Sequence, residues 1–307
     1  MNQVVANAGS VTLTLTWYQS GTPTDVNDVT IGIVDGNGTV VVAAETETTD
    51  NDDGTYTYVL ADQATPKILV ATWTDTSTGD TRVERLEVVG NLLFTENQAR
   101  TFAAKADATP ALKPLASSTE YPDAVIADER ARLTDDFENW TGRSWIPRYS
   151  RVVLKGTNSY SLWLGEGECK TSDGYALHRP GRLLDIAEIL SVTVGGVTVS
   201  ASNVEVDGDT LVRTDGHWSS PTVGDPFNVV VEYVYGLPYL ADGVDRMALK
   251  LLLDRLVPSA FPERALSAET DFGNTRFVQP GGPMNNRTRI PEVNEWLVAH
   301  DRNPVLW

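Results

Sequence analysis

The stretch Tyr121–Arg148, YPDAVIADERARLTDDFENWTGRSWIPR, decides the fold of this chain. Its apolar residues recur at offsets of seven, four and three, the spacing of one stripe along an α-helix. They are Ile126, Leu133, Phe137 and Trp140. The charged residues between them mostly fall on the other faces, where we expect solvent. The stretch therefore predicts a helix of about five turns.

Residues at both ends of the stretch predict where this helix begins and stops. Pro122 suits its first residue because a missing N–H has no cost there, and Asp123 suits the positive end of the helix dipole. Gly142 can end the helix in a left-handed cap, and Pro147 prevents a restart. Strand-like patterns follow Pro147, so we expect the helix to separate two β-rich parts of the chain.

Composition narrows the class of protein. The chain has 307 residues, 41% of them hydrophobic and 21% charged, which is typical of a soluble globular protein with room for two domains. Its net charge of −18 argues against a protein that grips nucleic acid through phosphates. The single cysteine, Cys169, excludes an intrachain disulfide and a cysteine-rich zinc site. The first residues lack signal-peptide features and no apolar run spans a bilayer, so we expect a cytosolic or assembled protein with no membrane contact.

Residues 1–90 are predicted to form an all-β module. Turn sequences rich in Asp, Asn and Gly separate short alternating segments, which favours a small antiparallel sandwich. The module carries 13 acidic residues against three basic ones, a net charge of −10, so we expect a solvated decoration domain. The expected strands are Val11–Trp17, Val29–Val34, Thr39–Ala44, Thr55–Leu60, Ile68–Thr74 and Arg82–Val89.

The rest of the chain divides into a linker and a larger domain. Residues 91–120 read as a linker with a short helix at Glu96–Lys105, and residues 121–307 as a helix followed by a β-meander. Later helices are expected after a cap at Asp242 and from Pro291. The predicted fold class is α+β. The expected strands of the meander are Arg151–Lys155, Ser159–Leu164, Tyr175–His178, Leu183–Val194, Val197–Ser200, Asn203–Val206, Thr210–Thr214 and Asn228–Tyr235, with a further β segment at Asn274–Val278.

Two resemblances add to this reading. The segment DNDDGTYTYVL, followed by a strand with Trp73, resembles immunoglobulin-like modules at the level of the sandwich class. The order of motifs in residues 92–307 resembles the head-to-tail connector (adaptor) proteins of long-tailed bacteriophages. The motifs that carry this second resemblance are Trp140–Arg143 with Ile146–Arg148, Tyr233–Pro238, Phe272–Gly281 and Ile290–Leu297.

The connector resemblance implies a structural virion protein at the neck, by the portal vertex, that assembles in the host cytoplasm. Such proteins form a ring, commonly of twelve copies, between the portal protein and the tail or neck proteins. DNA would pass through the lumen without sequence-specific binding, and an acidic wall would repel its phosphates. The resemblance and the apolar C-terminal residues together point to a portal-binding surface. Its expected members are Trp296, Val305, Leu306 and Trp307.

No residue pattern predicts catalysis, a metal site or a cofactor. GEGECKTSDG departs from a phosphate-binding loop, and Cys169 lacks a partner that lowers a thiol pKa. Asp50, Asp52 and Asp53 read as a solvated turn rather than a calcium loop. The three histidines, His178, His217 and His300, lack ligand spacing, the acids Asp135, Asp136 and Glu138 read as a solvated helix face, and the eight tryptophans read mainly as core.

Two other functions stay open at this stage. The sandwich of residues 1–90, with the tryptophans, would suit a module that binds glycans or a cell-surface partner. A hydrolase with loop carboxylates is a third hypothesis, although no carboxylate pair stands out. The connector hypothesis predicts symmetric assembly and no turnover, and the binding module predicts that residues 1–90 bind alone.

Overall fold

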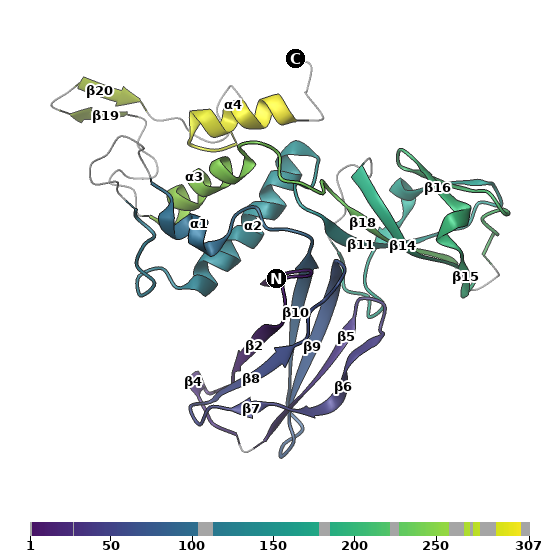
Figure 1. Cartoon of the computed structure of the whole chain (residues 1–307), viewed down its shortest axis with the longest axis horizontal. Coiled ribbons are helices and arrows are strands. Elements are labelled where there is room, and N and C mark those ends of the chain that lie inside the picture. Colours follow the sequence, from purple (N-terminus) through teal and green to yellow (C-terminus); the bar gives the residue numbers. More distant parts are fainter. Residues whose placement is uncertain are drawn as a thin grey trace. The chain divides into compact units, whose positions relative to one another are not determined.

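The computed structural model describes residues 2–26, 28–103, 113–177, 185–221, 227–257, 267–270, 273–276 and 287–301 (Figure 1). The fold is α+β with strands predominating, as expected at this level. The chain forms two compact units. The first unit combines Met1–Asn91 with Pro147–Arg179 and Leu183–Pro238, and the second combines Leu92–Ile146 with Pro180–Arg182 and Tyr239–Trp307.

These units do not follow the three ranges expected from the sequence. Residues 147–238 cluster with residues 1–91 instead of with the helices. A buried ion pair joins Glu87 to Arg148 and a partly buried hydrogen bond joins Asn37 to Glu232, in agreement with this grouping. The independence of residues 1–90 as a module stays a prediction.

In the first unit, residues 2–91 form two main sheets around one core. The larger sheet has the order β1 (Asn2–Val5), β10 (Thr81–Val89), β9 (Lys67–Asp75), β5 (Val29–Asp35) and β6 (Val40–Glu47). The smaller has the order β2 (Val11–Thr16), β8 (Thr55–Leu60) and β7 (Thr49–Asp50), and β3 (Tyr18–Gln19) pairs with β4 (Thr22–Pro23). Trp17, Tyr56 and Trp73 fill the shared core. The six expected strands are present, whereas β1, parallel to β10, was not predicted.

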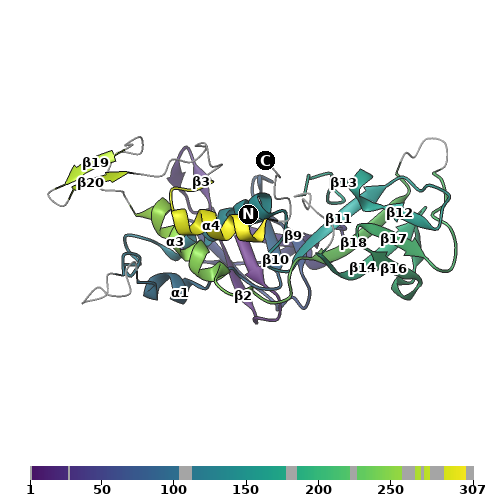
Figure 2. The ribbon, with the colours of Figure 1, turned by 90° about the horizontal axis from the view of Figure 1, so that it is seen from above.

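Residues 147–238 of the same unit form two further sheets (Figure 2). One has the order β13 (Glu168–Cys169), β11 (Arg148–Leu154), β18 (Val229–Tyr235), β14 (Ile186–Val194) and β15 (Val197–Val199). The other has the order β12 (Ser161–Trp163), β17 (Thr210–Arg213) and β16 (Val204–Asp207), and the short helices η1 (Leu164–Glu166) and η3 (Ala201–Asn203) flank these strands. Both sheets contribute to one core around Trp218.

The local turn chemistry of this region is mostly as predicted. Gly195 and Gly196 have φ angles of 59° and 79°, the left-handed pair that a two-residue hairpin between β14 and β15 requires. The expected strand Tyr175–His178 is wrong over its described part, because only an isolated bridge joins Lys170 to Ala176. His178 lies outside the described residues.

The second unit consists of helices and one hairpin. Its elements are α1 (Glu96–Thr101), α2 (Asp123–Thr141), α3 (Val244–Leu256), α4 (Pro291–His300), β19 (Ser267–Thr270) and β20 (Gly273–Arg276). In Figure 1, α3 and α4 lie beside α2, which contacts both. Gly142 ends α2 in the expected left-handed cap with φ of 66°. No helix among the described residues is long and apolar enough to span a membrane.

Three details of the helices differ from the predictions. Pro122 is the cap of α2 rather than its first residue, and Gly243, in a left-handed conformation, replaces Asp242 as the cap of α3. The helix α1 ends at Thr101, because the chain is extended at Phe102. The α2 faces that we expected to be solvated are partly buried, since α3 and the segment before α1 cover charged residues. Glu129 and Arg130 are covered in this way, and Glu138 is also buried.

Candidate functional site

The predicted partner-binding residue Trp296 lies on α4 in the second unit. Its ring is half-buried and stacks on His300 at 4.1 Å between centroids. It also contacts Trp145 at 5.0 Å and Phe137 at 5.7 Å. Trp296 is therefore anchored among aromatic rings from α2, the segment after it and α4. The other predicted members, Val305, Leu306 and Trp307, lie outside the described residues.

A polar cluster fixes the start of α4. The side chain of Asn294 accepts hydrogen bonds from the backbone N–H of Arg287 (3.1 Å) and Thr288 (2.9 Å), and donates to the Thr288 carbonyl (2.8 Å). The Arg287 guanidinium donates to the Trp140 carbonyl at the end of α2 and pairs with Asp301 at 2.7 Å. Asn294 is 8% exposed. We missed this site in the sequence. Its signal was the polar Asn294 next to Val293, on the face of a short helix that is buried.

The acids on α2 are partners of an arginine rather than a catalytic pair. Arg255 of α3 contacts Glu129 at 2.6 Å and Asp136 at 2.5 Å. Burial lowers the pKa of Arg255, but the hydrogen bonds that Arg255 donates to Glu129 and Asp136 outweigh it and raise that pKa overall. The prediction that Glu138 is solvated is wrong, because it is 1% exposed. This arrangement joins α2 to α3 and stabilises the unit.

A buried ion pair connects the two β parts of the first unit. Arg148 donates from Nε to Glu87 Oε1 (2.6 Å) and from Nη2 to Glu87 Oε2 (3.1 Å). The two side chains are 7% and 5% exposed. The bidentate geometry fixes both side chains as well as pairing their charges. Glu87 belongs to β10 and Arg148 begins β11, so the pair ties residues 2–91 to residues 147–238.

A second buried carboxylate, Glu232, lies at the same junction. It accepts hydrogen bonds from Tyr149 Oη (2.6 Å), Asn37 Nδ2 (3.4 Å) and Ser191 Oγ. Burial, followed by the charge of Glu232, raises the pKa of Tyr149 well above its usual value. The phenol therefore stays protonated and acts as a hydrogen-bond donor at neutral pH. The sequence contains a signal for this site, because Glu232 is the single charge in the apolar strand VVVEYVY.

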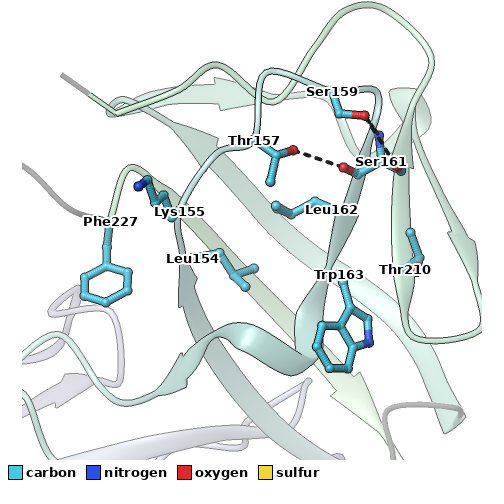
Figure 3. A pocket seen from close by; sticks show the side chains of 9 residues that line it. All are labelled: Leu154, Lys155, Thr157, Ser159, Ser161, Leu162, Trp163, Thr210 and Phe227. Carbon is cyan, nitrogen blue, oxygen red and sulfur yellow. Dashed lines mark hydrogen bonds between the residues drawn. The ribbon is translucent and has the colours of Figure 1, made fainter.

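A groove lies beside the small sheet of the first unit (Figure 3). Its volume is about 430 Å³. The buried side chains of Leu154 and Leu162 contribute apolar lining, and Trp163 lies at one end of the group in Figure 3. The remaining lining is mostly polar or aromatic: Lys155, Thr157, Ser159, Ser161, Thr210 and Phe227.

Metal ligands are not assembled into a closed site in the described parts of the chain. Oxygens of Asp25, Asp50 and Asp52 come within 4.8 Å of one another, but all three side chains are exposed. The Asp50 carboxylate accepts the Asp52 N–H at 2.8 Å, which is turn geometry. Asp53, expected beside them, accepts hydrogen bonds from Thr55, and these lower the Asp53 pKa.

Two histidines and the cysteine lie apart from that carboxylate group. His217 contacts Tyr160 in the first unit, His300 stacks on Trp296 in the second, and Cys169 is half-buried in β13. Within the described ranges, the candidate ligand group of Asp25, Asp50 and Asp52 therefore includes no histidine and no cysteine.

No protein-family model matches this chain, and a search of curated proteins finds no similar sequence. The function proposed next rests on the residue pattern of the chain and on the geometry of its described residues.

Proposed function

We propose that this chain is a head-to-tail connector (adaptor) protein of a long-tailed bacteriophage. It forms a ring of 12 copies between the portal protein and the tail or neck proteins in the virion. DNA passes through the ring without sequence-specific contacts, and the protein has no enzymatic activity. Residues 1–90 form an immunoglobulin-like decoration module added to the connector.

One observation carries the proposal: the sequence motifs behind the resemblance meet in pairs. The segment Ile146–Arg148 leads into β11, and Tyr233–Pro238 overlaps β18. Along these two strands Arg148 pairs with Tyr235 and Ser150 with Tyr233. Motifs about eighty residues apart thus form neighbouring strands, as expected if both belong to one structural framework.

The helical motifs also meet. Ile290–Leu297 forms the first part of α4, and its Trp296 contacts Trp145, which lies between the motif segments Trp140–Arg143 and Ile146–Arg148. The guanidinium of Arg287, just before the same motif, donates to the Trp140 carbonyl. The remaining motif, Phe272–Gly281, is described only at residues 273–276, which form β20. This second meeting of distant segments supports the same framework.

The chain's charge is compatible with a DNA conduit. A net charge of −18 at neutral pH repels phosphates on average, so a genome would slide past the protein instead of binding it. The acids that reasoning from the sequence singled out on α2 are engaged: Asp136 pairs with Arg255, and Glu138 is buried. A structural role therefore agrees better with them than acid–base catalysis does.

The test is the mass of the purified full chain, alone and mixed with candidate portal rings, measured by light scattering. A chain that ends before Asn303 and the double variant Leu306→Ser/Trp307→Ser serve as controls. We expect the full chain to co-migrate with the portal and both controls to lose that association. A chain that stays monomeric and ignores every portal ring offered would overturn the proposal.

A further inference from the structure

One tryptophan departs from the expectation that these residues fill the core. Trp17, Trp73, Trp145 and Trp218 are at most 2% exposed. Trp163, at the end of β12, is 49% exposed. An exposed indole alone is unremarkable, so its surroundings decide whether it has a role.

The Trp163 ring is held in a fixed orientation. Its Nε1–H donates to Asp209 Oδ2 at 2.6 Å. Gly165 lies against the ring so closely that a Cβ there would be 2.4 Å from Cζ2 and 2.5 Å from Cε2 of the indole. Gly165 therefore lies against part of the ring, and the ring also lines the groove. A flat, oriented, half-open aromatic surface is the result.

Hydroxyl groups line the other end of the same groove. Figure 3 shows Thr157, Ser159 and Ser161 at one end of the groove and Trp163 at the other, with Leu162 between them. The hydroxyls make local contacts: Thr157 donates to the Ser161 carbonyl (3.2 Å), Ser159 and Ser161 lie 3.4 Å apart, and the Ser159 hydroxyl accepts the Ser161 N–H (3.3 Å). Lys155, exposed at the edge, forms no ion pair with another residue of the described ranges.

This combination matches the chemistry of a sugar ring. A pyranose has one face of C–H groups, which packs on an aromatic ring, and an equatorial rim of hydroxyls, which both donate and accept hydrogen bonds. A volume of about 430 Å³ lies within the range of small-molecule sites. The tryptophans of residues 1–90, Trp17 and Trp73, are buried and offer no such surface.

We propose that the groove binds a pyranose unit of a glycan, stacked on the ring of Trp163. Thr157, Ser159 and Ser161 hydrogen-bond its hydroxyls, and Lys155 favours a sugar that carries a carboxylate. The groove shares no residue with the predicted portal-binding residues, and its role does not depend on the connector proposal.

The test is isothermal titration of the full chain with three soluble hexasaccharides: α-1,4-linked glucose, β-1,4-linked N-acetylglucosamine and α-1,4-linked galacturonic acid. We expect binding of at least one, with the galacturonic acid oligomer bound most tightly. Trp163→Ala should weaken binding about tenfold or more, since a stacked ring contributes on the order of 1.4 kcal/mol. Thr157→Val removes one exposed hydroxyl at almost constant shape and should weaken binding about twofold to tenfold.

Two controls keep the result interpretable. Tyr18→Ala removes another exposed aromatic, 53% exposed on β3, and should leave binding unchanged. Circular dichroism reports whether each variant folds. If Trp163→Ala does not fold, the Thr157→Val variant alone tests the groove. The proposal is overturned if none of the three oligosaccharides binds at millimolar concentration, or if both groove variants bind as the unaltered chain does.

Discussion

The two units bring distant parts of the chain together by different physical means. In the first unit, buried carboxylates bridge residues 2–91 and 147–238, through the ion pair of Glu87 with Arg148 and through the hydrogen bond from Asn37 to Glu232. In the second, aromatic rings join α2 to α4, with arginine contacts around them. A buried charge pair is all-or-none, because removal of one partner leaves the other uncompensated. Ring packing is graded, because its contribution follows the area buried.

The comparison predicts the largest effect for Arg148→Met. This change leaves Glu87 buried without its bidentate partner, so we expect a loss of about 3–5 kcal/mol in the free energy of unfolding. Urea denaturation followed by circular dichroism measures it. A loss below about 1 kcal/mol would contradict the all-or-none description.

The double variant Glu87→Leu/Arg148→Met sharpens this prediction. It removes both charges and leaves apolar side chains of similar size, so we expect it to recover most of the stability that Arg148→Met loses. A double variant as unstable as the single one would mean that the packing of Arg148, rather than its charge, joins the two β parts.

Aromatic packing in the second unit should give a smaller effect. Trp296→Ala removes contacts with Phe137, Trp145 and His300, but the ring is only half-buried. We therefore expect about 2–3 kcal/mol, below the 3–5 kcal/mol typical of a fully buried aromatic. Thermal and urea unfolding measure the loss, and Trp296→Phe should retain more than half of the stability. An unchanged midpoint for Trp296→Ala would assign this ring to a partner instead of to the fold.

The sequence predicted the elements of both units far better than their grouping. Ile126, Leu133 and Phe137 are fully buried, as their spacing on α2 required, and the turns at Gly142 and Gly195-Gly196 follow from backbone preferences. Those signals are local. The association of residues 147–238 with 1–91 depends on contacts over long sequence separations, such as Glu87 to Arg148, which no periodicity encodes.

The candidate sites show the same limit of local patterns. Glu232 is the single charge in an apolar strand, a signal that we did not use, and its partners Tyr149, Ser191 and Asn37 come from three other segments. Trp163 alternates with Leu162 like any strand residue. Its exposure and orientation depend on Gly165 and on Asp209, which a separate hairpin supplies.

Tyr149→Phe tests the hydrogen bond that the neutral Tyr149 hydroxyl donates to the buried carboxylate of Glu232. It removes one hydrogen bond to Glu232 but leaves the contacts from Ser191 and Asn37, so the carboxylate keeps partners. We expect a loss of about 1–2 kcal/mol, less than for Arg148→Met because no charge loses its counter-charge. Urea midpoints for the two variants, measured side by side, check this order. A larger loss of stability for Tyr149→Phe than for Arg148→Met would contradict the view that the buried ion pair contributes more than the hydrogen bond to Glu232.

The smallest effect should come from the exposed charge contact at the same junction, between Arg85 and Asp173 at 2.9 Å. A hydrogen bond from the Thr171 hydroxyl, and then Arg85, hold the pKa of Asp173 below its usual value of 3.8. Since the folded pKa is lower than the unfolded one, the ionised carboxylate stabilises the fold above pH 3.8, and this contribution is lost as the pH falls below that value.

Asp173→Asn should therefore lower the urea midpoint at pH 7. We expect a loss of no more than about 1 kcal/mol in the free energy of unfolding, because solvent screens the Arg85–Asp173 pair. The difference from the unaltered chain should shrink as the pH falls below 3.8. Asp207→Asn, at an exposed position on β16, is the matched control and should leave the urea midpoint unchanged at pH 7. A difference between Asp173→Asn and the unaltered chain that persists at pH 2 would show that the shape of the Asp173 turn, not its charge, contributes to the junction. The larger loss of stability in Arg148→Met than in Asp173→Asn would then reflect the burial of Arg148, and the charge of the exposed Asp173 would not contribute to stability.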